Sequence, residues 1–196
     1  MATAKRARVA GNEKLNPWTC RVVCEMEEPA ELPFTGGQYI IVNSGVTLPN
    51  GKMGKRAYSI PSPDADAGRF ELIVRQIPNG VGSGFIHGLE PGMTFEFSGP
   101  WGKFLPSSAS NGARILVAAT DTGITAALGL LRGASYGRHL GFTDLVWFVE
   151  SEDYFIPWEL VRAWIPRELS SAARVFIPRV GEATRSDAAC ADIRSR

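Results

Sequence analysis

The stretch Arg56-Ala57-Tyr58-Ser59-Ile60-Pro61-Ser62 places a cation, an aromatic ring and a hydroxyl close together at the end of an expected strand. Because alternate residues of a strand share a face, Arg56 and Tyr58 point the same way while Ser59 points across. This set suits a planar ligand that carries a phosphate: a guanidinium holds the phosphate, a phenol ring stacks, and a hydroxyl binds the edge. The alternative is an ordinary edge strand with a solvated Arg56 and a half-buried Tyr58.

Around this stretch, residues 5 to about 98 have the pattern of short strands separated by turns. The expected strands are rich in β-branched and aromatic residues, and they cover residues 22–23, 38–43, 56–60, 69–76 and 93–97. In residues 69–76, the apolar Phe70, Leu72 and Val74 alternate with the residues between them, which is typical of a sheet with one buried face. The pattern predicts an N-terminal antiparallel β-barrel or sandwich.

From residue 113 onward the pattern changes to strand, helix, strand, helix, strand. The expected elements are residues 114–119, 124–132, 145–149, 158–165 and 173–177. This order predicts a short parallel α/β domain with right-handed crossovers. Residues 106–112 are small and polar and look like a linker. The predicted domains are therefore residues 1–110, the β-barrel, and residues 111–196, the α/β domain.

Composition excludes some kinds of partner. The 196-residue chain has a formal net charge of +1, so no global field attracts nucleic acid or an anionic membrane. Its three cysteines lack the clustered spacing of a zinc or iron-sulfur site, so no metal site is expected, and Cys20 and Cys24 are predicted to be small core residues. No apolar run is long enough to span a membrane, and the basic N-terminus leads into no signal segment, so we expect a cytoplasmic protein.

A glycine-rich loop follows the strand at residues 69–76. In residues 79–88 (Asn-Gly-Val-Gly-Ser-Gly-Phe-Ile-His-Gly), Gly80 and Gly82 would allow a phosphate to approach the backbone. Ser83 would cap a short helix and offer its hydroxyl. A plain hairpin loop is the alternative for this segment.

Together these motifs resemble the ferredoxin-NADP reductase superfamily over roughly residues 9–179. The resemblance rests on Arg-x-Tyr-Ser, the strand ending in Val74-Arg75, the glycine-rich loop, Gly99-Pro-Trp-Gly-Lys-Phe104 and Thr122-Gly-Ile-Thr125, in this order. It implies an FAD-binding barrel followed by an NAD(P)-binding domain. It also implies electron transfer from NADH or NADPH through FAD to a ferredoxin, a haem or an oxygenase component.

The resemblance implies a role for each motif residue. Arg56 would hold the flavin diphosphate, Tyr58 would pack on the isoalloxazine, and Ser59 would lie near flavin N5, which accepts hydride. Tyr58 and Ser59 are thus the expected catalytic residues. The other expected cofactor-binding residues are Val74 and Arg75, which line the flavin through their backbone; Gly80, Gly82 and Ser83, which cradle the diphosphate; and Thr122, Gly123 and Thr125, which meet the pyridine nucleotide.

Two departures from the family pattern affect the second domain. Thr120-Asp121 replaces the usual glycine pair, so Asp121 either repels a bound diphosphate or acts as a helix N-cap. After Ile177 the sequence shows no further apolar strand and no Cys-Gly-Pro segment, and Cys190 does not match one. The nucleotide domain is therefore expected to be truncated.

These departures leave a second functional hypothesis open. The chain would then be a flavin-binding module without pyridine-nucleotide activity, acting as a partner subunit or in another flavin reaction. The sequence does not separate FAD from FMN. If a nucleotide binds, Glu150 and Glu152 would repel a 2′-phosphate, which favours NADH over NADPH.

Overall fold

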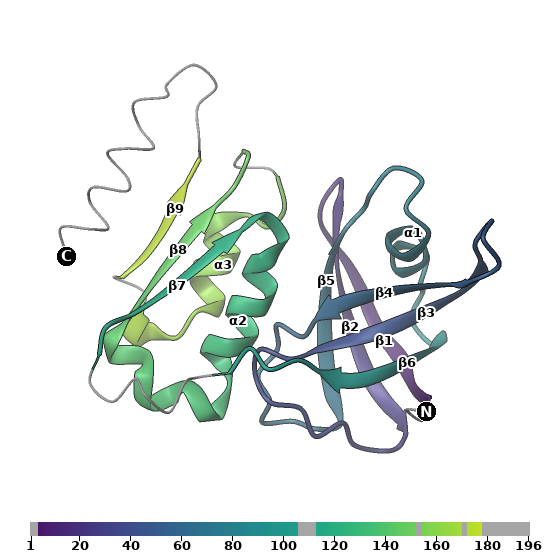
Figure 1. Ribbon diagram of the computed structural model, residues 1–196, viewed down its shortest axis with the longest axis horizontal. Helices are drawn as coiled ribbons and strands as arrows, with labels where there is room; N and C mark the ends of the chain where they lie inside the picture. Colours follow the sequence, from purple (N-terminus) through teal and green to yellow (C-terminus); the bar gives the residue numbers. More distant parts are fainter. Residues whose placement is uncertain (1–3, 106–112, 152–153, 170–171, 178–196) are drawn as a thin grey trace.

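The computed structural model describes residues 4–105, 113–151, 154–169 and 172–177. Figure 1 shows two halves side by side: six strands with one short helix, and a smaller parallel sheet with its helices. The predicted linker at residues 106–112 and the predicted boundary between residues 110 and 111 lie outside the described residues, so the two domain ranges stay predictions.

The first half is an antiparallel sheet with strand order β4-β3-β6-β1-β2-β5. Its elements are β1 (Lys5–Asn16), β2 (Thr19–Glu28), β3 (Tyr39–Thr47), β4 (Met53–Ser59), β5 (Arg69–Arg75), α1 (Val81–His87) and β6 (Thr94–Trp101). The predicted antiparallel, barrel-like fold is confirmed. However, the described residues form no ladder between β4 and β5, so the barrel is open along this seam.

The sequence pattern explains how β5 contributes to two cores. Phe70, Leu72 and Val74 are buried inside the barrel, as their alternation predicts. Ile73 points the other way and is also buried, because it packs into the core of the second half. An apolar residue on the outer face of an alternating strand here marks the contact between the halves.

The second half is a three-stranded parallel sheet with strand order β7-β8-β9, as predicted. Its elements are β7 (Ile115–Thr120), the 3-10 turn η1 (Asp121–Gly123), α2 (Ile124–Arg132), the 3-10 segment η2 (Ala134–Phe142), β8 (Thr143–Phe148), α3 (Trp158–Trp164), the 3-10 turn η3 (Arg167–Leu169) and β9 (Ala173–Phe176). In Figure 1, α2 lies between this sheet and the barrel. Most of its residues are buried for that reason.

Glycines allow the two halves to meet backbone to backbone. A β-carbon at Gly129 of α2 would overlap the carbonyl oxygen of Ile60, and one at Gly36 would overlap the carbonyl oxygen of Gly129. Asp64 adds hydrogen bonds on both sides, since its two carboxylate oxygens accept the backbone N–H groups of Gly36 and Ala134, each at 2.9 Å. These contacts fix how the halves are placed relative to each other.

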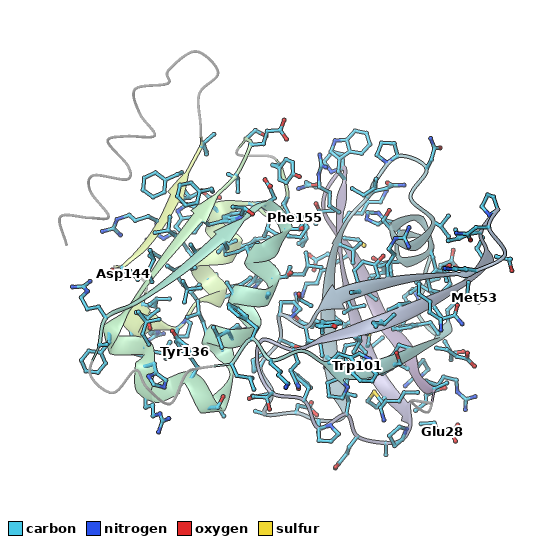
Figure 2. All side chains as sticks on the ribbon, viewed as in Figure 1. Glu28, Met53, Trp101, Tyr136, Asp144 and Phe155 are labelled. Carbon is cyan, nitrogen blue, oxygen red and sulfur yellow. The ribbon has the colours of Figure 1, made fainter. Side chains whose placement is uncertain are left out.

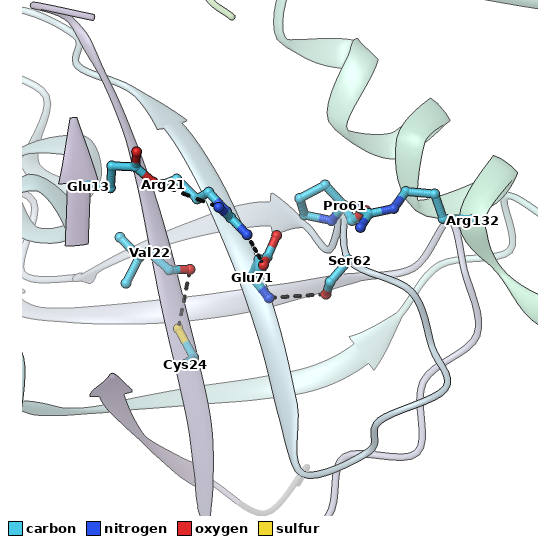
Figure 3. Close-up of polar contacts among 8 residues, drawn as sticks. All are labelled: Glu13, Arg21, Val22, Cys24, Pro61, Ser62, Glu71 and Arg132. Atoms are coloured by element: carbon cyan, nitrogen blue, oxygen red, sulfur yellow. Dashed lines mark hydrogen bonds and ion pairs between the residues drawn. The ribbon is translucent and has the colours of Figure 1, made fainter. Parts of the chain in front are cut away.

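Charged groups extend the same interface. Arg132 of α2 donates from Nη1 to the carbonyl oxygen of Pro61 at 2.9 Å, and burial lowers its pKa (Figure 3). Nearby, Arg21 of β2 pairs with Glu71 of β5, and its guanidinium lies 5.6 Å from the ring centroid of Trp164. Within the part of the chain that the structure describes, no helix is long and apolar enough to cross a membrane.

Candidate functional site

One pocket, with a volume of about 410 Å³, opens at the junction of the barrel and the α/β half. All eleven site residues predicted from the sequence line it: Arg56, Tyr58, Ser59, Val74, Arg75, Gly80, Gly82, Ser83, Thr122, Gly123 and Thr125. They come from three regions of the chain, residues 56–59, 74–83 and 122–125. The structure therefore brings together the complete set of residues that the sequence motifs singled out.

The pocket lies at the open seam of the barrel. Its walls include residues of β4 and β5, the two edge strands of the six-stranded sheet. Edge strands expose backbone N–H and C=O groups that no neighbouring strand satisfies, and a ligand in the seam can use them. Helix α1 lies beside both strands, since Gly82 packs on β4 and His87 Nε2 donates to the carbonyl oxygen of Val74 at 2.9 Å.

Close packing against Arg56 and Tyr58 explains why residue 82 is a glycine. A β-carbon at this position would lie 2.5 Å from Arg56 Cγ and 2.8 Å from Tyr58 Oη. Arg56 also donates from Nη1 to the carbonyl oxygen of Lys55 at 2.8 Å. Tyr58 is half-buried, and burial raises its pKa to about 12, so the phenol stays neutral at physiological pH. Any larger residue at position 82 would therefore displace the Arg56 and Tyr58 side chains.

Ser83 does not cap helix α1, so that expectation was wrong. The helix begins at Val81, its N-cap is Gly80, and no side chain caps it. Ser83 lies inside the first turn, where its hydroxyl accepts the Ile77 N–H at 3.0 Å and donates to the Gly80 carbonyl at 3.2 Å. The hydroxyl therefore fixes the shape of the glycine-rich loop that lines the pocket.

The turn after β7 forms the opposite wall. Thr122 and Gly123 are exposed, while Thr125 is buried and donates from Oγ1 to the Thr122 carbonyl at 2.8 Å. Asp121 is not a helix N-cap, because Gly123 has that position and no side chain caps α2. Asp121 instead has a left-handed backbone with φ of 47°, and its carbonyl accepts a 2.8 Å hydrogen bond from Trp147 Nε1.

The charge of the pocket favours an anionic ligand. Among the described residues that line it are two arginines, Arg56 and Arg75, and no aspartate or glutamate. Arginine binds phosphate groups through paired donors, and a cleft lined by one sign of charge concentrates ligands of the opposite sign. This arrangement suits a ligand that combines a planar ring with phosphate.

A second hollow, of about 390 Å³, lies beside the first. It shares Ile77 and Gly80 with the pocket and is lined further by Val46, Val81 and Phe85. Val46 and Ile77 are exposed apolar side chains, so the hollow is a shallow apolar trough. The two hollows therefore lie next to each other on the barrel.

Sequence reasoning missed several features of the site. Ala57, Ile73 and Ile77 also line the pocket. Ile73 carried a signal, because it is apolar at an outward position of an alternating strand. The side chain of Arg75 was also missed, since only its backbone was expected to take part, and it contacts Tyr154 of the other half.

Other predicted features have mixed outcomes. Cys20 and Cys24 are free and buried, as predicted for core residues. Glu150 is exposed just beyond β8, whereas Glu152 lies outside the described residues. Across residues 4–105, 113–151, 154–169 and 172–177, no group of three or more His, Cys, Asp or Glu residues forms a metal site.

The chain is similar to known electron-transfer proteins. It is 36% identical over 128 residues to "Ferredoxin--NADP reductase B" of Sorangium cellulosum (strain So ce56), covering 65% of this chain and 51% of that protein. It is 31% identical over 149 residues to "Alkene monooxygenase system, ferredoxin--NAD(+) reductase component" of Xanthobacter autotrophicus (strain ATCC BAA-1158 / Py2), covering 75% of this chain and 42% of that protein. The chain thus spans about half the length of the curated relatives it matches, or less.

A solved structure shares the fold. The Amycolatopsis cytochrome P450 reductase GcoB superposes with a TM-score of 0.73 at 23% identity, covering 99% of this chain and 60% of that chain. The family model described as "Oxidoreductase FAD-binding domain" matches residues 6–105, which is just over half of the chain. This region contains β1 to β6, α1 and the Arg-x-Tyr-Ser motif. The chain therefore belongs to the family of oxidoreductase FAD-binding domains.

Proposed function

We propose that this chain binds FAD in the pocket at the β4–β5 seam, accepts electrons there from NADH, and passes them to a ferredoxin or an oxygenase component. The convergence of all eleven predicted residues on one pocket carries the proposal. The names of the two curated relatives, a ferredoxin–NADP reductase and a ferredoxin–NAD(+) reductase component, support the same class of reaction. The cytoplasmic location expected from the sequence belongs to this proposal.

The residues present fit FAD. Ligand pockets of a few hundred Å³ hold a drug-sized ring system, and the pocket's 410 Å³ falls in that range. The adjacent trough beside Ile77 and Gly80 offers an apolar surface for a second ring, such as the adenine of FAD. Together with the match to the FAD-binding domain family, this neighbouring surface supports FAD over FMN, which has no second ring system.

The residues of the barrel would hold and orient the cofactor. Arg56 would bind the diphosphate, and the neutral Tyr58 ring would pack against the isoalloxazine. Gly82 allows helix α1 to approach both side chains, and Ser59 offers a hydroxyl from the end of β4. FAD itself supplies the hydride chemistry when bound, and the protein supplies position and electrostatics.

The α/β half would present the nucleotide. Thr122 and Gly123 are exposed, line the same pocket as Tyr58 and Ser59, and lie at the carboxyl end of β7. Glu150, exposed beyond β8, would repel a 2′-phosphate, which supports NADH over NADPH as the donor.

Anaerobic mixing of the FAD-loaded protein with NADH, and separately with NADPH, tests this proposal. We expect NADH to bleach the flavin absorbance, with a rate that saturates as its concentration rises. NADPH should require a higher concentration for the same rate. A protein that binds FAD but is bleached by neither nucleotide would contradict the reductase function.

The second candidate would then replace it. A flavin-binding module without pyridine-nucleotide activity is favoured by one observation: Asp121 holds a left-handed conformation where a glycine would be unstrained, beside the turn that should meet the nucleotide. Bleaching by dithionite but not by NADH would support this candidate.

A further inference from the structure

The side chain of Arg75 crosses from the barrel to the α/β half. It leaves the end of β5, donates from Nε to the carbonyl oxygen of Tyr154 at 3.1 Å, and places its guanidinium carbon 4.2 Å from the centroid of the Tyr154 ring. A guanidinium over an aromatic face is a cation–π contact. Arg75 is thus held by both the backbone and the ring of one residue in the other half, while it also lines the pocket.

The segment that carries Tyr154 is fixed on both sides. Asn16, at the end of β1, donates from Nδ2 to the carbonyl oxygen of Phe155 at 2.7 Å. Phe155 and Ile156 are each only 1% exposed and belong to the core of the α/β half. Figure 2 shows Phe155 beside the junction of the two halves. Tyr154 and Phe155 therefore connect the core of one half to two polar side chains of the other.

We infer that Arg75 is a positioning residue. It acts through Tyr154 and holds the α/β half against the barrel beside the pocket, so that the Thr122–Gly123 turn stays opposite Tyr58 and Ser59. Its Nε already donates to the Tyr154 carbonyl, and the face of its guanidinium already contacts the Tyr154 ring. For this reason we assign Arg75 to this contact rather than to a ligand. The consequence for hydride transfer rests on the proposed function, whereas the contact itself does not.

Two different roles for Arg75 predict different responses to substitution. If Arg75 acts through Tyr154, then Tyr154→Ala removes the cation–π contact, whereas Arg75→Met removes that contact together with the hydrogen bond to the Tyr154 carbonyl. The double variant should then be no worse than Arg75→Met alone. If Arg75 instead bound an anionic part of the cofactor or nucleotide, only Arg75→Met would weaken that ligand. Arg75→Lys would then restore much of the affinity, because the charge is retained. Lysine lacks the planar fork, so it should not restore the contact with Tyr154.

The first measurement is hydrogen exchange of the cofactor-free protein, which needs neither FAD nor NADH. We expect Arg75→Met to speed exchange of the amides of residues 154–156 by about tenfold, because local opening becomes easier. Tyr154→Ala should speed it by less, because the hydrogen bond from Arg75 to the carbonyl of residue 154 remains. Tyr154→Phe, which keeps the ring, and Arg69→Met, at the exposed start of β5, should leave this exchange unchanged. Unchanged exchange in both Arg75→Met and Tyr154→Ala would overturn the inference even if the protein is a reductase.

The second measurement separates binding from reaction. With FAD bound, we expect the limiting rate of flavin reduction by NADH to fall about tenfold in Arg75→Met and by less in Tyr154→Ala, since small displacements of reacting groups are costly. The dissociation constant of FAD should change less than about threefold. Weaker FAD or NADH binding in Arg75→Met alone, recovered in Arg75→Lys, would overturn the positioning role. Failure of the wild type to bind FAD would overturn the proposed function and leave the exchange result to decide this inference.

Discussion

Asp121 has a left-handed backbone, with φ of 47°, and its carbonyl oxygen accepts a 2.8 Å hydrogen bond from the buried indole of Trp147. Trp147 lies on β8, next to the strand that leads into the Asp121 turn. The hydrogen bond stabilises a conformation that costs an L-residue about 1–2 kcal/mol. The turn that forms one wall of the pocket is therefore held by a core residue behind it.

The first prediction concerns Asp121→Gly. Glycine removes the left-handed cost and adds about 0.4–1 kcal/mol of unfolded-state entropy, so the free energy of unfolding should stay equal or rise by up to about 1 kcal/mol. Replacing a true N-cap by glycine would instead lower it by a few tenths of a kcal/mol. Urea unfolding distinguishes these outcomes, and a clear loss of stability would contradict the assignment made here.

Asp121→Asn is the matched variant for charge. Asparagine tolerates the left-handed conformation but carries no charge. If the carboxylate opposes a bound diphosphate, both variants should tighten NADH binding by about 1 kcal/mol, the repulsion of two charges ~4 Å apart in water. Titration with NADH measures this, and equal affinity in all three proteins would mean that the carboxylate does not face the nucleotide.

The second prediction is that Gly82→Ala damages the site. The added methyl would meet Arg56 and Tyr58, so both side chains must move, at a cost of about 1–3 kcal/mol in stability, and FAD affinity should fall. Gly84→Ala in the same helix is the control, because nothing lies within 4 Å of its β-carbon, and it should raise stability by about 0.5–1 kcal/mol. Thermal melts of the two variants should therefore shift in opposite directions; a shift in the same direction would contradict the packing argument.

The third prediction is that Ser59 contributes to the reduction of bound FAD and not to the binding of FAD. In Ser59→Ala the dissociation constant of FAD should stay within about threefold of the wild-type value. The rate at which NADH reduces the bound FAD should fall, by about 10²-fold, the typical scale of one lost polar contact in a transition state. Ser59→Thr keeps the hydroxyl and should recover part of the rate. Single-turnover reduction by NADH is the measurement, and an unchanged rate in Ser59→Ala would remove Ser59 from the reaction.

The fourth prediction is a loss of stability at alkaline pH. Burial raises the pKa of Cys20 from 9.0 to about 12, so between these values the unfolded state binds fewer protons than the folded state. Stability is then fully present below pH 9 and falls as the pH rises toward 12. The free energy of unfolding, measured with urea between pH 9 and 12, should fall less steeply with pH in Cys20→Ala than in the wild type. An identical pH dependence in the variant would mean that this thiol is not the cause.

Much of the fold was predictable because it follows from local patterns. Alternation in β5 and the apolar run of β7 predicted an antiparallel half followed by a parallel one, and the bounds of α2 were predicted to the residue. Strand β1 was not predicted, because residues 5–16 contain few β-branched or aromatic residues and bury only Ala7 and Val9 in the barrel core. Its place depends on pairing with β2 and β6, which are contacts distant in sequence.

Most of the residues that line the pocket were singled out from the sequence, but their supporting contacts were not. Short motifs mark the residues that line the pocket, because such chemistry needs particular side chains at fixed spacing. The roles of Ser83 inside α1 and of Arg75 across the junction depend on where a helix begins and on which loop of the other half lies opposite. Neither role follows from the residue types next to them in the sequence.

Titration of cofactor-free protein with FAD, followed by the change in flavin fluorescence, tests the central claim most directly. We predict saturable binding by the wild type and by Lys55→Ala, whose side chain is exposed on the same strand, and a loss of about 10- to 100-fold in affinity for Arg56→Ala, since charged hydrogen bonds contribute about 1.5–3 kcal/mol. A wild-type protein that takes up no FAD, or equal affinity in Arg56→Ala, would contradict the account.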